Sequence, residues 1–223
     1  MCGRFALAKT SEEIADYFSL KQLPDLPPRY NIAPSQQIAV IIHKDEFPER
    51  KLVMMRWGLI PSWAKDEKIG YKMINARAET VSEKPAFRSA FKKRRCLIPT
   101  DGFYEWWHKG KSKQPYFVTM KNKGLFAFAG IWDRWKSPTG EIVESCSIVT
   151  TEANSLIGKI HDRMPVIIQR ESFGTWLNPV QSEIGLKQYM RPFSPYKMTT
   201  YPVSNMVNSP QNDSPACIKR SLQ

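Results

Sequence analysis

Five short apolar segments follow one another through the middle of the chain and constrain its fold more than any other feature. Between residues 95 and 151 they read RCLIP, GFYEWW, PYFVTM, LFAFAGIW and SCSIVTT. Turn-rich segments such as KGKSKQ and NKG lie between them, and short β-rich runs divided by turns are typical of successive strands. Further strands are expected at QIAVIIH, KLVMMRW, PVIIQ and KMTTYPVS. The sequence therefore predicts an α+β fold in one domain, with a mainly antiparallel, barrel-like β core.

Helices are expected only at the periphery of this core. Thr10-Ser11-Glu12-Glu13 fits a capping box, which marks the start of a helix. Other short helices are predicted over residues 85–93, 152–160, 172–177 and 183–190. The Pro-rich segment KQLPDLPPRYNIAPSQ predicts an extended loop. We expect residues 1–208 to form the domain, with the polar segment 209–223 as a loosely held tail.

The chain is strongly basic. It has 33 Lys and Arg against 21 Asp and Glu, which gives a formal net charge of +12. Such an excess predicts a polyanionic partner, most often nucleic acid. Trp63 lies in a predicted loop, and basic residues such as Arg77 and Arg88 lie in or near other loops. Aromatic rings beside cations are typical of a surface that binds single-stranded nucleic acid.

The cysteines and histidines do not form a metal-binding pattern. None of Cys2, Cys96, Cys146 and Cys217 belongs to a C-x-x-C pair, and the three histidines are far apart. We expect neither a metal nor a cofactor. Cys96 and Cys146 lie in apolar runs and are interpreted as inert core thiols. Without an apolar leader or a run of about 18 apolar residues, the expected location is the cytoplasm, or the nucleoid of a bacterium.

Cys2 directly follows Met1. If Met1 is removed, residue 2 presents an α-amine and a thiol on adjacent carbons. The amine titrates near ~8, against ~10.4 for lysine, and the thiolate is strongly nucleophilic. This pair could attack an ester or amide carbonyl, or condense with an aldehyde and close to a thiazolidine. An inert cysteine is the alternative interpretation, because most free cysteines are structural.

Three other residues are candidates for chemistry, and each also has a structural explanation. Asn75, in the INAR motif, could orient an amine or hydroxyl, or could simply occupy a turn. Glu105 is surrounded by aromatic residues in TDGFYEWW, where burial would raise its pKa toward neutrality; alternatively, it faces water on a strand. His161, in the loop IHDRMP, could act as a general acid or base, or be a surface residue.

Taken together and in order, the motifs carry more information than any of them alone. MCGRF, RYNIAP, WGLIPSWA, INARAET, RCLIPTDGFYEW, IHDRMP and PVSNMVN resemble the SOS-response-associated peptidase (SRAP) family, the abasic-site processing proteins. The resemblance runs from Met1 to about Asn208. It implies covalent capture of abasic sites in single-stranded DNA by Cys2, through a thiazolidine, after autocatalytic removal of Met1.

The resemblance also implies a role for each candidate residue. Asn75 would position the amine, Glu105 would serve as acid and base in ring opening and reversal, and His161 would bond the sugar hydroxyl. The family's contacts with DNA would fall on Arg4, Trp63, Arg77 and Arg163, the three arginines on phosphates and the tryptophan where the next base would stack. A monomer is expected, because nothing in the sequence indicates an interface.

Three rival functions remain open from the sequence. An N-terminal-nucleophile amidohydrolase also begins with Cys after Met, but it would leave the basic charge unexplained. A non-covalent single-strand binding module would make Cys2 incidental. A cysteine peptidase could pair Cys2 with His161 in a dyad.

Overall fold

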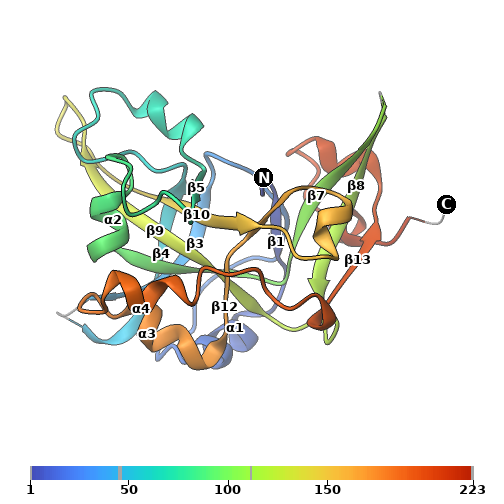
Figure 1. Cartoon of the computed structure of the whole chain (residues 1–223), viewed down its shortest axis with the longest axis horizontal. Helices are drawn as coiled ribbons and strands as arrows, with labels where there is room; N and C mark the ends of the chain where they lie inside the picture. The colour runs from blue at the N-terminus through green and yellow to red at the C-terminus, as the bar shows by residue number, and fades with distance from the viewer. Residues whose placement is uncertain (1, 45–46, 111, 222–223) are drawn as a thin grey trace.

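The computed structural model describes residues 2–44, 47–110 and 112–221, and its strands fall into two sheets. The smaller sheet lies at the right of Figure 1 and the larger sheet at the left; β1, a strand of the smaller sheet, lies near the middle of the view. The smaller sheet has the strand order β13-β8-β7-β1-β2 and all its pairings are antiparallel. Its strands, in that order, are Met198–Pro202, Ser112–Met120, Gly102–Lys109, Phe5–Leu7 and Arg29–Ile32.

The larger sheet contains a closed ring of strands. β10 pairs with β4, and the pairing continues through β3, β6 and β9 back to β10. The ring strands are β3 (Gln37–Lys44), β4 (Phe47–Trp57), β6 (Arg95–Thr100), β9 (Phe126–Lys136) and β10 (Ile142–Glu152). The short strands β5 (Asn75–Arg77), β11 (Arg163–Pro165) and β12 (Ile167–Ile168) attach to β10 or β9. The predicted α+β fold with a barrel-like, mainly antiparallel core is confirmed.

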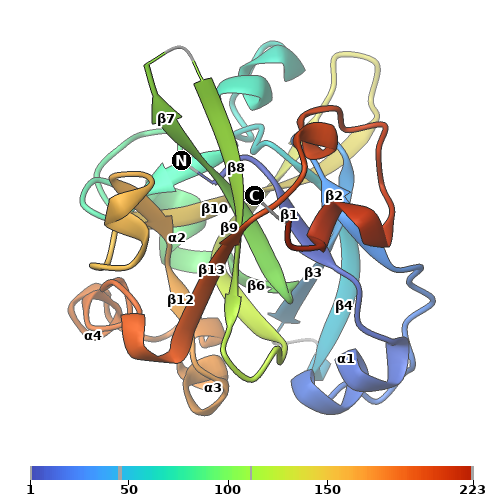
Figure 2. The ribbon, with the colours of Figure 1, turned by 90° about the vertical axis from the view of Figure 1, so that its right-hand side faces the viewer.

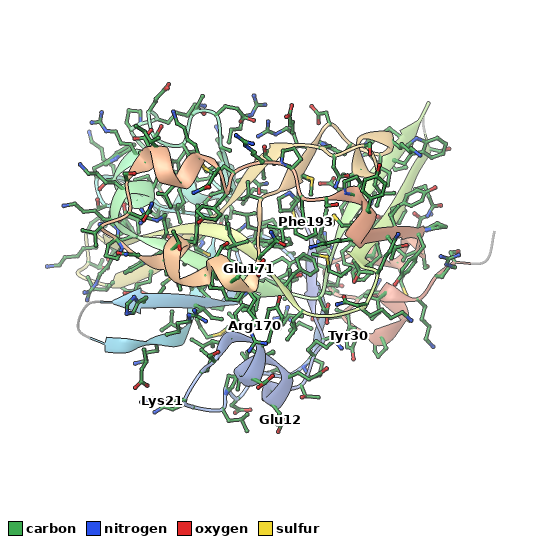
Figure 3. All side chains as sticks on the ribbon, turned by 60° about the horizontal axis from the view of Figure 1, so that its bottom comes forward. Glu12, Lys21, Tyr30, Arg170, Glu171 and Phe193 are labelled. Atoms are coloured by element: carbon green, nitrogen blue, oxygen red, sulfur yellow. The ribbon has the colours of Figure 1, made fainter. Side chains whose placement is uncertain are left out.

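Helices lie outside the sheets, as expected. The capping box is confirmed at α1 (Ser11–Phe18), where the Thr10 hydroxyl accepts from the Glu13 amide at 3.2 Å and the Glu13 carboxylate accepts from the Thr10 amide at 2.9 Å. Figure 3 shows Arg170 above this helix. The other α-helices are shorter than predicted: α2 (Arg88–Lys93), α3 (Phe173–Leu177) and α4 (Glu183–Lys187).

Short 3₁₀ turns complete the framework. They are η1 (Glu67–Lys72), η2 (Ile157–Lys159), η3 (Arg170–Ser172), η4 (Pro195–Lys197), η5 (Asn205–Asn208) and η6 (Pro215–Ile218). The helix predicted over residues 152–160 is therefore only the 3₁₀ turn η2. Among the described residues, the longest helices are too short to cross a membrane.

The smaller sheet buries both of its faces, because side chains alternate along each strand. Phe5 and Phe103 point into the main core, while their neighbours Ala6 and Tyr104 point to a second, smaller core on the other face. Val207 and Cys217, from the end of the chain, cover this second core and are fully buried. Figure 2 shows the C-terminal segment lying against β1 and β2.

Two predictions about the segments outside the core were wrong. The Pro-rich segment expected to be a loop contains β2, whose Phe5↔Ile32 and Leu7↔Arg29 pairings with β1 complete the smaller sheet. The polar tail expected to be loose is docked through its described residues: Ser221 donates a backbone hydrogen bond to Pro202, and Val203 bridges to Arg220. Both segments are largely polar, and backbone hydrogen bonds hold them in place in part. Such bonds leave no apolar pattern in the sequence, so neither segment was predicted correctly.

Candidate active site

Cys2 lies three residues before β1, whose side chains point to both cores, and none of its surface is exposed. Its thiol is 3.9 Å from the Arg4 carbonyl oxygen, to which it can donate. Its own carbonyl oxygen accepts a 2.8 Å hydrogen bond from the Asn75 side-chain amide. Burial is the main cause that raises the pKa of the Cys2 thiol. The thiol is therefore neutral in this arrangement, and ionising it requires a nearby proton acceptor.

Asn75 reaches Cys2 from β5, a three-residue strand held parallel to β10 by the pairs Ile148↔Asn75 and Thr150↔Arg77. Ala76, between them, is fully buried. Alternation therefore places Asn75 and Arg77 on one face. The Asn75 Oδ1 atom is buried and accepts no hydrogen bond from the described residues. The Asn75 Nδ2 atom thus donates to the Cys2 carbonyl oxygen, while its Oδ1 atom remains available to accept a hydrogen bond.

Glu105 lies on β7 and is only 2% exposed, so the interpretation that it faces water is wrong. Burial raises the pKa of its carboxyl to about 7. The charges of Glu105 and Cys2 are close enough that Glu105 further raises the pKa of the thiol. A carboxyl with this pKa can both donate and accept a proton near neutral pH, as a general acid–base must.

His161 follows η2 and is partly exposed. Its Nδ1 atom accepts a 3.0 Å hydrogen bond from the Arg163 backbone amide and lies 2.8 Å from a carboxylate oxygen of Asp162. Partial burial lowers the pKa of His161. The neutral ring accepts at Nδ1 and so carries its proton on Nε2, whereas the charged ring would instead donate to Asp162.

The three arginines expected to contact DNA differ in their surroundings. Arg4 is 9% exposed and hydrogen-bonds through Nη1 to protein acceptors. Arg163 forms a two-pronged ion pair with Glu79, at 2.7 and 2.9 Å, and donates to the Thr150 carbonyl oxygen. Arg77 is exposed on the strand that carries Asn75. Of the three, Arg77 presents the most accessible charge.

Trp63 is 59% exposed and is one of the residues that line a surface pocket separate from Cys2. The pocket lining, besides Trp63, is Ser62, Pro85, Ala86, Arg88, Ser89 and Asp133. The loop that carries Trp63 starts at Gly58, where φ is +125° and a side chain would lie 2.6 Å from the Gly70 carbonyl oxygen. Only glycine fits this close approach, which fixes the loop against η1.

The structure brings together residues that are distant in the sequence. Asn75 contacts Cys2 directly, Glu105 lies close to Cys2, and Asp162 beside His161 lies close enough to raise the pKa of Glu105. Sequence reasoning missed Glu79 and Asp162, the acidic partners of Arg163 and His161. Both stand within the motifs INARAET and IHDRMP, so their proximity to candidate residues was the available signal.

Fold and site together define a class: proteins with a closed β ring, an adjoining antiparallel sheet, and a buried cysteine near the N-terminus beside an amide and a carboxyl of raised pKa. Residues 1–210 match the model of the SOS response associated peptidase (SRAP) family. The chain belongs to this family.

Similar proteins cover almost the whole chain. Abasic site processing protein YoqW of Bacillus subtilis is 48% identical, over 98% of this chain and 99% of its own. Abasic site processing protein HMCES of Xenopus tropicalis is 34% identical, over 86% of this chain and 65% of its own. A crystal structure of a protein from Bacteroides thetaiotaomicron matches with a TM-score of 0.89 and 32% identity, over 99% of this chain and all of that one.

Proposed function

We propose that this protein processes abasic sites in single-stranded DNA by forming a covalent link through Cys2, which shields the lesion during repair. The observation that carries the proposal is the contact between the Asn75 amide and the Cys2 carbonyl, beside a carboxyl with a pKa of about 7. The similarity to proteins named for abasic site processing supports it.

The chemistry requires Met1 to be removed by hydrolysis, which we propose to be autocatalytic. The free amine of Cys2 then adds to the C1′ aldehyde of the ring-opened sugar and loses one water to give a Schiff base. The thiol adds to the same carbon, its proton passes to nitrogen, and a thiazolidine forms. No oxidant or reductant is needed. The activity toward the abasic site is lyase-like, and reversal runs through the same steps.

Glu105 and His161 supply the proton transfers in this scheme. The Glu105 carboxyl, with its pKa of about 7, gives a proton to the departing ring oxygen and to the departing water, and takes one from the thiol. His161, held at Nδ1 by the Arg163 amide, directs its Nε2 proton to a sugar hydroxyl. Asn75 orients the amine through its buried oxygen.

The DNA strand is proposed to run across Trp63 and Arg77. The exposed indole offers a stacking surface for the base next to the lesion, and the exposed guanidinium binds a phosphate. Arg4 and Arg163 add positive charge near the nucleophile, within a chain of net charge +12. We propose that the protein acts as a monomer in the cytoplasm or nucleoid, without a cofactor.

A denaturing gel tests the proposal. The protein is incubated with a single-stranded oligonucleotide that carries one abasic site, beside Cys2→Ala and a form with one extra residue before Cys2. A slow band that survives denaturation with the wild type alone supports covalent capture by a free N-terminal cysteine.

Two further measurements separate the alternatives. Mass spectrometry of the wild type establishes whether Met1 is absent, and a glutamine hydrolysis assay measures amidohydrolase activity. If Met1 is absent and no band forms, the capture hypothesis is wrong. Glutamine hydrolysis that depends on Cys2 would then favour the amidohydrolase, and oligonucleotide binding unchanged in Cys2→Ala would favour the binding module.

A further inference from the structure

Two sequence motifs that play no part in the proposed chemistry meet in the structure. RYNIAP contributes Asn31, on β2, and PVSNMVN contributes η5, near the chain's end. The Asn31 side chain is fully buried, and its Nδ2 atom donates to carbonyl oxygens at 3.2, 2.9 and 2.6 Å. These acceptors are Val207, Ser209 and Asn212. Asn31 therefore gathers the segment 204–213, which we name the C-terminal clasp.

Asp213 fastens the far end of the clasp to the edge of the smaller sheet. One carboxylate oxygen accepts from the backbone amides of Tyr30 and Asn31, and the other accepts from Arg29 Nε. Figure 3 shows Tyr30 beside the C-terminal segment. An edge strand leaves amides unpaired, and the clasp supplies their acceptors.

The clasp also binds the N-terminal segment that contains Cys2. Arg4 Nη1 donates to Asn31 Oδ1 and to the Val207 carbonyl oxygen, each at 2.7 Å. The Arg4 guanidinium lies 6.0 Å from the centre of the Trp106 ring, and the Trp106 indole donates to Asn208 Oδ1 at 2.8 Å. Arg4 is thus held between Asn31, the clasp backbone and the residue that follows Glu105.

We propose that the C-terminal clasp is a positioning device for Cys2, with Asn31 as its central positioning residue acting through Arg4. A chain terminus is poorly ordered unless it is tied down. Once Met1 is gone, no residue precedes Cys2, so the position of Cys2 depends on Asn75 and on Gly3, which links it to Arg4. Misplacing a reacting group by about 1 Å can slow a reaction about 100-fold.

This inference rests on the proposed function, so its experiment measures position and chemistry separately. Asn31→Ala is compared with Asn205→Ala, a matched control on the exposed part of the clasp. Binding is measured with an oligonucleotide carrying tetrahydrofuran, an abasic analogue that cannot form the aldehyde. The crosslinking rate is measured at saturating protein, and amide hydrogen exchange is followed in residues 3–7.

For Asn31→Ala, the maximal crosslinking rate is expected to fall at least about tenfold, with analogue affinity within about threefold, because reacting groups are displaced without loss of the DNA surface. Exchange in residues 3–7 is expected to rise, whereas Asn205→Ala is expected to match the wild type. An unchanged rate and unchanged exchange in folded Asn31→Ala would overturn the proposal. A wild type that forms no crosslink would refute the proposed function, while exchange would still report on the clasp.

A milder variant keeps the test decisive if Asn31→Ala does not fold. Arg4→Lys retains the charge but not the planar fork, and Asp213→Asn weakens the far end of the clasp. If the residues act through one tether, combining Arg4→Lys with Asp213→Asn slows crosslinking less than the product of the two single effects. Independent effects that multiply would contradict a common tether.

Discussion

The buried region around Cys2 and the exposed surface around Trp63 and Arg77 differ in their contact with water. Cys2 and Glu105 are 0% and 2% exposed, and burial raises the pKa of both. Trp63 is 59% exposed, and Arg77 is exposed as well. Burial of Glu105 brings the pKa of its carboxyl near 7, where it can transfer protons. Exposure of Trp63 and Arg77 leaves the ring and the guanidinium accessible to a DNA strand. Under the proposed function, the buried region carries out the chemistry and the exposed region binds the DNA strand.

The largest effect is expected from Glu105→Gln, because the amide removes the proton donor and acceptor while keeping its shape. The crosslinking rate is expected to fall by about 10²–10⁴-fold, the usual contribution of general acid–base catalysis. Affinity for the tetrahydrofuran oligonucleotide is expected to stay near the wild-type value. A rate within twofold of wild type would remove Glu105 from the chemistry.

The same substitution is expected to stabilise the protein at high pH. Burial raises the pKa of Glu105 from 4.5 to about 7, so the folded state holds a proton that the unfolded state releases. Wild-type stability from this group therefore falls as pH rises from 4.5 to 7, by at most about 3 kcal/mol. The thermal unfolding temperature of Glu105→Gln should be higher than that of the wild type at pH 8 and equal to it below pH 4.5. An equal gain at both pH values would contradict the buried-charge explanation.

Asn75→Ala is expected to slow crosslinking by about 10-fold or more, because a lost hydrogen bond to a buried carbonyl is worth about 1–3 kcal/mol. Asn75→Asp should fare no better, since the carboxylate cannot donate to the Cys2 carbonyl oxygen. Single-turnover gels measure the rate, with Asn205→Ala as the control. Full activity in Asn75→Asp would show that the donated bond is unimportant.

Trp63→Ala sharpens the comparison from the exposed side. Loss of a stacking ring is expected to weaken single-strand binding by about 1–3 kcal/mol, with thermal stability unchanged. Fluorescence anisotropy measures the affinity, and Tyr196→Ala, which removes a ring that is 84% exposed, is the control. An equal loss of affinity in both variants would mean that the Trp63 ring does not stack specifically on a DNA base.

Arg77→Ala should have the smallest effect and a dependence on salt. Loss of one phosphate contact is expected to lower the slope of log affinity against log salt by about 0.7 for a single strand. Binding titrations at several salt concentrations measure this slope, and Arg191→Ala removes an equal charge beyond α4 as the control. If the two slopes agree, Arg77 acts only through net charge.

The sequence alone determined the fold class, because alternating apolar runs separated by turns can bury their side chains only as paired strands. It also placed the α1 cap and the candidates Cys2, Asn75, Glu105 and His161, because motifs record residue identity and order. Short helices and β2 were harder, since a few residues leave little periodicity to read. Local sequence pattern therefore identifies candidate residues, but it does not predict their surroundings.

Only the tertiary structure decided how those residues are held. Glu105 is buried because it shares with Phe103 the face of β7 that points toward Cys2 and the main core, while residues about 100 positions later in the chain cover the opposite face. The clasp, the Arg163–Glu79 pair and the inward-facing Arg4 depend on partners 27 to 203 residues away. Burial and pairing at such separations leave no local signature, because they arise from the path of the whole chain.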